Sequence, residues 1–122
     1  MLQSGIKGLL QKMSIHYKIS GSGSHVLLIH GLFGSHENLN SIAQALSSTY
    51  SVVALDLPGH GRSTHLPVYD LDKMSAQIEA LLSNLGIKDT AIVGHSLGGK
   101  IAMKLALRNQ LHVNKLVIAD IS

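Results

Sequence analysis

The chain has 122 residues, of which 45% are apolar, and this length and composition suit one folded domain rather than a disordered or fibrous protein. Ten Lys and Arg against seven Asp and Glu give a net charge of +3, and because the basic residues are scattered, this small excess does not indicate a nucleic-acid partner. With no cysteine, disulfides, thiolate zinc sites and a cysteine nucleophile are excluded, and no apolar run approaches the roughly 18 residues that a membrane span needs.

Residues 1–12 are expected to form a loose extension ahead of a domain that covers residues 13–122. The extension lacks the unbroken apolar core of a secretory signal, so the expected location is the cytoplasm. The mitochondrial matrix is the alternative, because several Lys lie among Ser and Leu and no acidic residue precedes Glu37.

Strands and helices are predicted to alternate along the rest of the chain. Polar and apolar residues alternate as in a half-buried strand at 14–20, and GSGS at 21–24 predicts a turn. Continuous apolar runs predict a buried strand at 25–31 and further apolar strands at 51–58, 90–96 and 115–121. Helical spacing of apolar residues predicts helices at 36–48, 71–85 and 97–109. Together these elements predict an α/β fold, a mostly parallel sheet with helices on both faces.

The predicted helices carry start and stop signals and one basic stripe. Ser35 and Asp70 are the expected N-caps of the first two helices, and Gly86 is the expected stop of the second. In the third helix a basic residue recurs every fourth position, at Lys100, Lys104 and Arg108. This stripe is interpreted as a solvated outer face, with an anion-binding face as the alternative.

Two incompatible motifs overlap in the stretch AIVGHSLGGKI at residues 91–101. Residues 94–100 nearly spell the phosphate-binding loop G-x-x-x-x-G-K-[ST], whereas residues 94–98 spell the nucleophile elbow G-x-S-x-G. The phosphate loop needs Ser or Thr after its Lys to bind magnesium, but the next residue is Ile101. The elbow is complete, because its two glycines allow a tight turn that holds Ser96 in a strained conformation.

A glycine-rich segment, HGLFG at residues 30–34, gives a second and independent signal of acyl chemistry. Attack on an ester forms a tetrahedral oxyanion, which enzymes stabilise with preorganised backbone N–H groups. The predicted donors are the N–H groups of Leu97, beside the nucleophile, and Leu32, with Phe33 as the alternative to Leu32. Together with the elbow, this segment favours Ser96 as a catalytic nucleophile.

Three segments in this order, HGLFGS, DLPGHGRS and VGHSLGGK, resemble the N-terminal half of an α/β-hydrolase. More narrowly, the chain resembles the small intracellular esterases of that superfamily, and the resemblance covers residues 14–122. It implies the α/β-hydrolase fold, apparently truncated after the sixth strand, and serine-dependent ester hydrolysis without a cofactor. Ser96 argues against the dehalogenases and epoxide hydrolases of the superfamily, which use Asp at the elbow.

A serine nucleophile needs a histidine base and a carboxylate that orients the histidine. Asp120 is the predicted acid, because it closes the strand next to the elbow strand and matches the position of the acid in the esterases that the chain resembles. Asp56 is the rival acid, and with His60 it is interpreted as part of a structural turn. The only histidine after Ser96 is His112, and a helix of about thirteen residues would place it roughly 20 Å away.

The sequence therefore predicts a chain that lacks the lid, the last strands and the histidine base of a complete enzyme. The predicted function is hydrolysis of small-molecule carboxylic esters of short to medium acyl size, through an acyl-enzyme on Ser96. No metal or cofactor site and no nucleic-acid partner is predicted. The alternatives are an inactive hydrolase remnant that self-associates through its exposed sheet edge, and a nucleotide-binding protein that uses Lys100.

Overall fold

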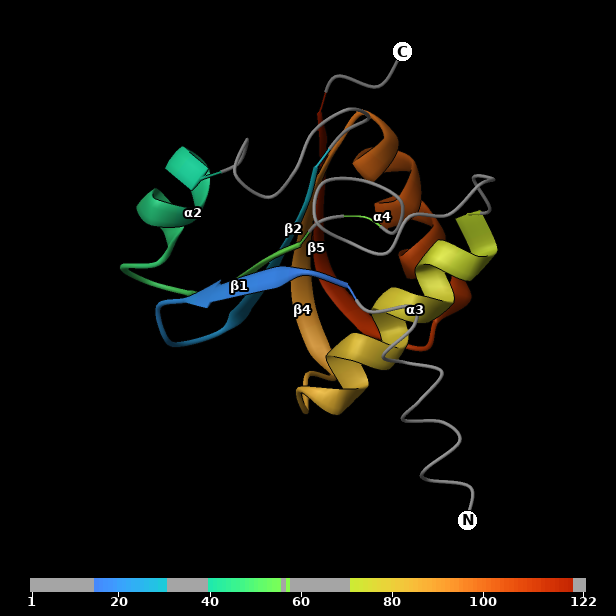
Figure 1. Ribbon diagram of the computed structural model, residues 1–122, viewed down its shortest axis with the longest axis horizontal. Helices are drawn as coiled ribbons and strands as arrows, with labels where there is room; N and C mark the ends of the chain where they lie inside the picture. The colour runs from blue at the N-terminus through green and yellow to red at the C-terminus, as the bar shows by residue number, and fades with distance from the viewer. Residues whose placement is uncertain (1–14, 31–39, 56, 58–70, 120–122) are drawn as a thin grey trace.

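The structure is a computed structural model that describes residues 15–30, 40–55, 57 and 71–119. In this part of the chain five strands form one sheet, in the order β1-β3-β2-β4-β5 (Figure 1). The strands are β1 (Tyr17–Ser20), β2 (His25–Ile29), β3 (Ser51–Leu55), β4 (Asp89–His95) and β5 (His112–Ala119). Only the pairing of β1 with β3 is antiparallel among these, and the other three pairings are parallel. The predicted mostly parallel α/β sheet is confirmed, with five strands described where the resemblance counts six.

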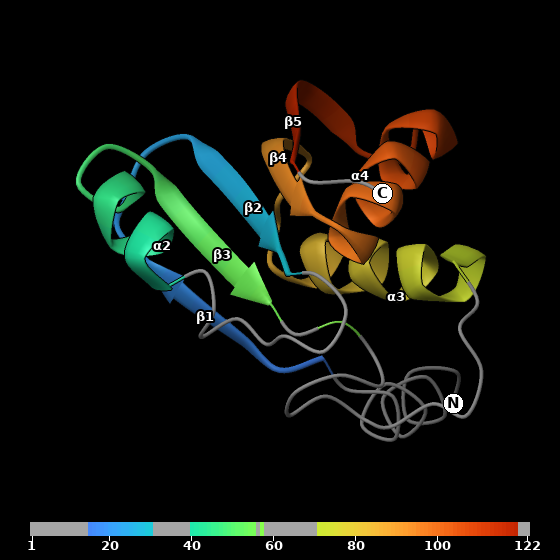
Figure 2. The same cartoon turned by 90° about the horizontal axis from the view of Figure 1, so that it is seen from above.

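Helices cover both faces of the sheet, as predicted. The helices described are α2 (Asn40–Leu46), α3 (Leu71–Asn84) and α4 (Leu97–Arg108). Figures 1 and 2 show α2 on one face and α3 with α4 on the other. Because consecutive side chains of a strand point to opposite faces, each buried strand supplies both layers of the core.

Two apolar clusters result from this alternation. On one face Ala43 of α2 packs with alternate residues of β2 and β3, namely Val26, Leu28, Val52 and Ala54. On the other face the remaining strand residues pack with α3 and α4, in a larger cluster that includes Leu27, Ile29, Val53, Leu55, Met74, Ile78, Leu82, Ile101 and Leu105. The two central strands β2 and β3 are apolar after their first residue because both of their faces are buried there.

The ends of the elements agree with the predicted signals where the structure describes them. Gly86 follows α3 with φ 75°, and Asn109 ends α4 in the left-handed conformation with φ 58°. β5 begins at His112, three residues before the predicted start, because His112 pairs with Asp89 at the start of β4. The register shifts after the next pair, Thr90 with Val113, so Asn114 is an extra residue in β5. The proposed caps Ser35 and Asp70 lie outside the described residues.

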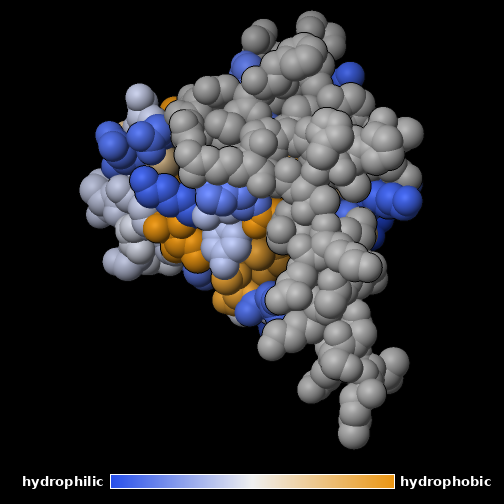
Figure 3. All heavy atoms as spheres, viewed as in Figure 1, coloured by the Kyte–Doolittle hydropathy of each residue, from blue (hydrophilic) through white to orange (hydrophobic). Residues whose placement is uncertain are grey.

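The two outer strands of the described sheet are much less buried than its centre. Leu116 and Val117 of β5 are 40% and 53% exposed, and Ile19 of β1 is 46% exposed. Figure 3 shows apolar atoms at the surface over β1, beside hydrophilic ones. α4 lies against β5, but β5 has a strand neighbour on only one side in the described sheet, so its exposure agrees with the exposed sheet edge that the sequence predicts.

Candidate active site

The turn between β4 and α4 consists of one residue, Ser96. β4 ends at His95 and α4 begins at Leu97. Ser96 has φ 57° and ψ −118°, a strained conformation for a residue with a side chain. The surrounding main chain holds it there, since the Ser96 N–H donates to the carbonyl oxygen of Ala119 at 3.1 Å and its own carbonyl accepts from the N–H of Gly99 at 2.9 Å. The strained turn expected from G-x-S-x-G is present.

The glycines on either side of Ser96 are required by close main-chain contacts. A Cβ atom at Gly94 would overlap the carbonyl oxygen of Gly98. A Cβ atom at Gly98 would in turn overlap the carbonyl oxygens of Ile29 and His30, at the end of β2. The elbow is therefore locked between its own helix and the neighbouring parallel strand.

This geometry decides between the two overlapping motifs. A phosphate-binding loop wraps an open run of backbone N–H groups around its ligand. Here Gly94 belongs to β4, while Gly99 and Lys100 already belong to α4, so a single residue remains for the loop. Ile101, which stands where a magnesium-binding hydroxyl is needed, is completely buried in the core. The arrangement fits a nucleophile elbow and does not fit a phosphate loop.

One of the two predicted oxyanion donors lies in the described residues. Leu97 is the first residue of α4, so its N–H has no carbonyl partner within the helix and lies at the positive end of the helix dipole. The other predicted donors, Leu32 and Phe33, lie outside the described residues. So do the predicted acid Asp120 and its rival Asp56. Their assigned roles stay predictions.

The end of β5 is nevertheless tied directly to the elbow. Ala119 pairs with His95 in the parallel register, and its carbonyl accepts the Ser96 N–H. Asp120 is the next residue along the chain. The residue that precedes the predicted acid therefore lies beside the nucleophile, which is consistent with the predicted role of Asp120.

His112 lies at the opposite end of the sheet from Ser96. It is paired with Asp89, the first residue of β4, and its Nδ1 is 3.0 Å from the Asp89 Oδ1 atom. Six residue steps of β4 separate Asp89 from His95, which corresponds to about 20 Å. His112 is therefore excluded as the base for Ser96 within one copy of the chain, as the sequence predicted.

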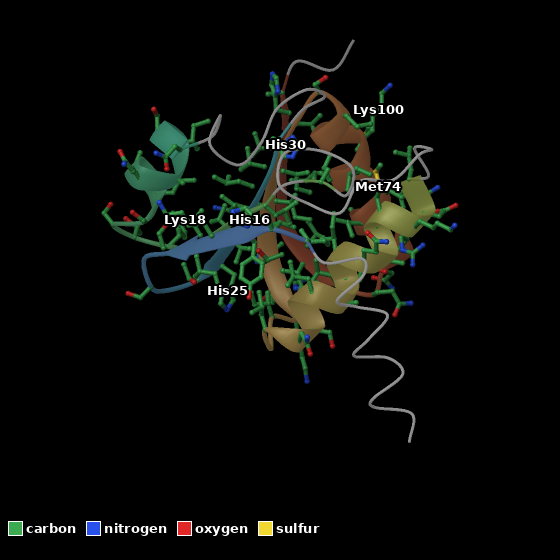
Figure 4. The ribbon with its side chains drawn as sticks, viewed as in Figure 1. His16, Lys18, His25, His30, Met74 and Lys100 are labelled. Atoms are coloured by element: carbon green, nitrogen blue, oxygen red, sulfur yellow. The ribbon has the colours of Figure 1, made fainter. Side chains whose placement is uncertain are left out.

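Most of the basic stripe of α4 pairs with acidic residues of α3 and is only partly exposed to solvent. The Lys104 Nζ atom is 3.1 Å from Asp72 Oδ1, and the Arg108 Nη2 atom is 2.9 Å from Glu79 Oε1, so both basic residues pair with acids of α3. The Glu79 carboxylate raises the pKa of Arg108. The prediction of a fully solvated face is therefore wrong for Lys104 and Arg108. Helical spacing shows which residues share a face, but not that a second helix lies beside that face. Only Lys100 points away into solvent (Figure 4).

A residue that the sequence did not single out as functional is buried beside the elbow. His30, interpreted as part of a turn, is 1% exposed, and its Nε2 accepts a hydrogen bond from the Leu57 N–H at 2.7 Å. Its position directly after an apolar strand and before a glycine was the available signal. Elsewhere in the described residues no group of three or more His, Asp or Glu could hold a metal ion.

Comparisons with known proteins agree with this geometry. The zebrafish (Danio rerio) sn-1-specific diacylglycerol lipase ABHD11 is 40% identical over 84% of this chain and 33% of its own length. Esterase YbfF of Escherichia coli is 34% identical over 83% of this chain and 40% of its own length. The chain therefore spans between a third and two fifths of these relatives.

Solved structures match over the same region. A marine microorganism esterase superposes with a TM-score of 0.83 and 31% identity, over 87% of this chain and 41% of the esterase. The epoxide hydrolase CorEH superposes with a TM-score of 0.81 and 32% identity, over 85% of this chain and 37% of that enzyme. None of the helices described here is long and apolar enough to cross a bilayer.

The family model described as alpha/beta hydrolase fold matches residues 24–122, and this span contains the elbow, the strands that lock it and the helix that follows it. The chain belongs to the alpha/beta hydrolase fold family.

Proposed function

We propose that this chain carries the nucleophile of a serine hydrolase that cleaves carboxylic esters of short to medium acyl size. The observation that carries the proposal is the strained one-residue turn at Ser96, held by main-chain contacts at the carboxyl end of a parallel sheet. Ligands of open α/β sheets bind at this end, so the turn presents the hydroxyl where a substrate would arrive.

In the proposed reaction the Ser96 Oγ attacks the ester carbonyl carbon, and its proton passes to a histidine base. The N–H groups of Leu97 and Leu32, with Phe33 as the alternative, stabilise the oxyanion. Asp120 orients the base. The alcohol leaves with the proton, and water then releases the acid from the acyl-enzyme. Because no histidine of this chain is assigned as the base, the 122-residue chain alone is expected to be inert or very slow.

The relatives support the reaction class, ester hydrolysis, but not a particular substrate. The similar proteins include a diacylglycerol lipase and an esterase, and the matching structures include a further esterase. The similar epoxide hydrolase shows that the fold alone does not select the reaction. We base the choice of ester hydrolysis on the hydroxyl at position 96.

The proposal is tested by labelling the protein, as its native source makes it, with a fluorophosphonate probe. We expect the label on the peptide that contains Ser96, and we expect Ser96→Ala to abolish both labelling and ester turnover. Alanine tolerates φ 57° no better and no worse than serine, so the melting temperature should be unchanged.

Ser75 offers a matched control for that substitution. Its side chain is completely buried and its Oγ has no hydrogen-bond partner, so Ser75→Ala makes the same chemical change on α3, outside the elbow. This variant should label like the wild type. Labelling that survives Ser96→Ala would overturn the assignment of the nucleophile.

A second candidate function is self-association through the edge of β5. It is favoured by the exposure of Leu116 and Val117 on a strand that has only one partner in the described sheet. It predicts a mass in sedimentation equilibrium that rises with concentration, and a monomer after Val117→Lys. A monomeric wild-type chain at all concentrations would remove this candidate.

A further inference from the structure

His30 connects three parts of the sheet that meet at the elbow. It directly follows β2, its ring bonds to the residue that lies just beyond β3, and its carbonyl oxygen lies against Gly98 of α4. Figure 4 shows its side chain inside the fold near the end of β2. The three segments are distant in sequence, and His30 contacts all of them through its ring or its main chain.

The hydrogen bond of His30 fixes the chemical state of its ring. The Leu57 N–H can only donate, so Nε2 must present a lone pair, and a neutral ring then carries its proton on Nδ1. Leu57 is completely buried, so its N–H has no access to solvent if the imidazole is removed. A buried donor without a partner is costly, and the main chain would shift to satisfy it.

Any such shift is transmitted to the nucleophile by contact. The carbonyl oxygens of Ile29 and His30 touch Gly98 so closely that a single added carbon would overlap them. Gly98 is two residues from Ser96 and in contact with Gly94, on the other side of the turn. Densely packed main chain moves as a unit, so the end of β2 cannot move without moving the elbow.

From these contacts we propose that His30 is a positioning residue for Ser96. By accepting the Leu57 N–H, its ring holds the end of β2 against Gly98 and thereby sets where the Ser96 hydroxyl lies. His30 does not touch the substrate. The inference deepens the proposed function and rests on Ser96 as the nucleophile.

The test compares two substitutions that differ in one capacity, in the protein as its native source makes it. His30→Gln places an amide oxygen about where Nε2 lies and can accept the Leu57 N–H, whereas His30→Leu fills similar space and cannot. We expect His30→Leu to lower kcat and the rate of fluorophosphonate labelling at Ser96 by about tenfold or more, with KM changed less than threefold. His30→Gln should recover labelling to within about threefold of the wild type.

Ile78→Ala is the control for a general loss of stability. Ile78 is completely buried in the larger apolar cluster, which also contains Leu57, but it belongs to α3 and not to the elbow. We expect it to lower the melting temperature without slowing labelling at a temperature where the protein stays folded. Equal labelling by His30→Leu and wild type, or slow labelling by a folded His30→Gln, would overturn the proposal.

Amide resonances of Ser96 and Gly98 separate this inference from the proposed function. They should shift in His30→Leu and return toward the wild-type positions in His30→Gln, whether or not Ser96 reacts. A wild-type protein that is never labelled would defeat the proposed function alone. Resonances that stay in place in a folded His30→Leu variant would defeat the positioning role.

Discussion

The two ends of β4 illustrate how one strand supports two unlike environments. At its carboxyl end Ser96 sits in a strained turn that is enclosed by main-chain atoms. At its amino end Asp89 bonds to Asn114 and His112 through side chains that are exposed to solvent. Each end brings polar groups together, but only the first fixes them with contacts that cannot relax. The comparison teaches that proximity of a histidine and a carboxylate, as at the amino end, does not by itself indicate a catalytic site.

The largest predicted effect follows from adding one carbon to the carboxyl end. Gly98→Ala would force apart the carbonyl oxygens of β2 and the start of α4, and we expect it to lower the free energy of unfolding by about 3 kcal/mol. Thermal or urea denaturation measures this loss. Gly86→Ala is the control, because Gly86 has φ 75° but open space around it, whereas Gly98 lacks space for a Cβ atom. It should cost only about 1 kcal/mol.

Equal costs for the two glycine variants would break the comparison. They would mean that the main-chain contacts around Gly98 relax readily, and that the carboxyl end is no more rigid than an ordinary helix terminus.

Removing the strain at Ser96 should have a smaller effect, of opposite sign. Ser96→Gly allows φ 57° without a Cβ penalty, so we expect the free energy of unfolding to rise by about 1 kcal/mol while labelling is lost. The other described residue with positive φ and a side chain is Asn109, at the end of α4. Asn109→Gly should stabilise less, because Asn adopts this conformation readily, and should leave labelling unchanged. A fall in stability for Ser96→Gly would contradict the view that the turn is strained.

The smallest effect is expected at the amino end, and it depends on pH. The hydrogen bond from Asn114, followed by the interactions with His112, lowers the pKa of Asp89 below its ordinary value. A carboxyl whose pKa is lower in the folded state stabilises the protein above the unfolded pKa, and this contribution is lost as the pH falls through the folded pKa. Asn114→Ala should therefore raise the pKa of Asp89 and reduce stability slightly at pH 7. The difference from wild type should vanish in acid.

Carboxyl-carbon NMR titration of Asp89 and denaturation at two pH values measure these two effects. Because Asp89 is exposed, salt should weaken them further. An unchanged Asp89 titration in Asn114→Ala would show that the amide contact is not maintained in solution.

Much of the fold was readable from the sequence because its signals are local. Apolar runs and helical spacing gave the alternation of strands and helices, and Gly86 marked the end of α3 as predicted. The elbow was readable for the same reason, since Gly94, Ser96 and Gly98 are close in the chain. What was missed depends on distant parts of the chain. The pairing of Arg108 with Glu79, the start of β5 at His112 and the bond between His30 and Leu57 each require knowledge of which segments become neighbours.

The elbow is closed by main-chain atoms, and this has a consequence for the versatility of the scaffold. Because carbonyl oxygens and glycines hold the turn, the side chain at position 96 contributes little to the frame that presents it. The reacting group can therefore be exchanged while the support stays the same. An esterase and an epoxide hydrolase both superpose on this chain, as expected if the main-chain support is independent of the reacting side chain. In evolution, a substitution at this one position can therefore change the chemistry while the sheet and the turn keep their structure.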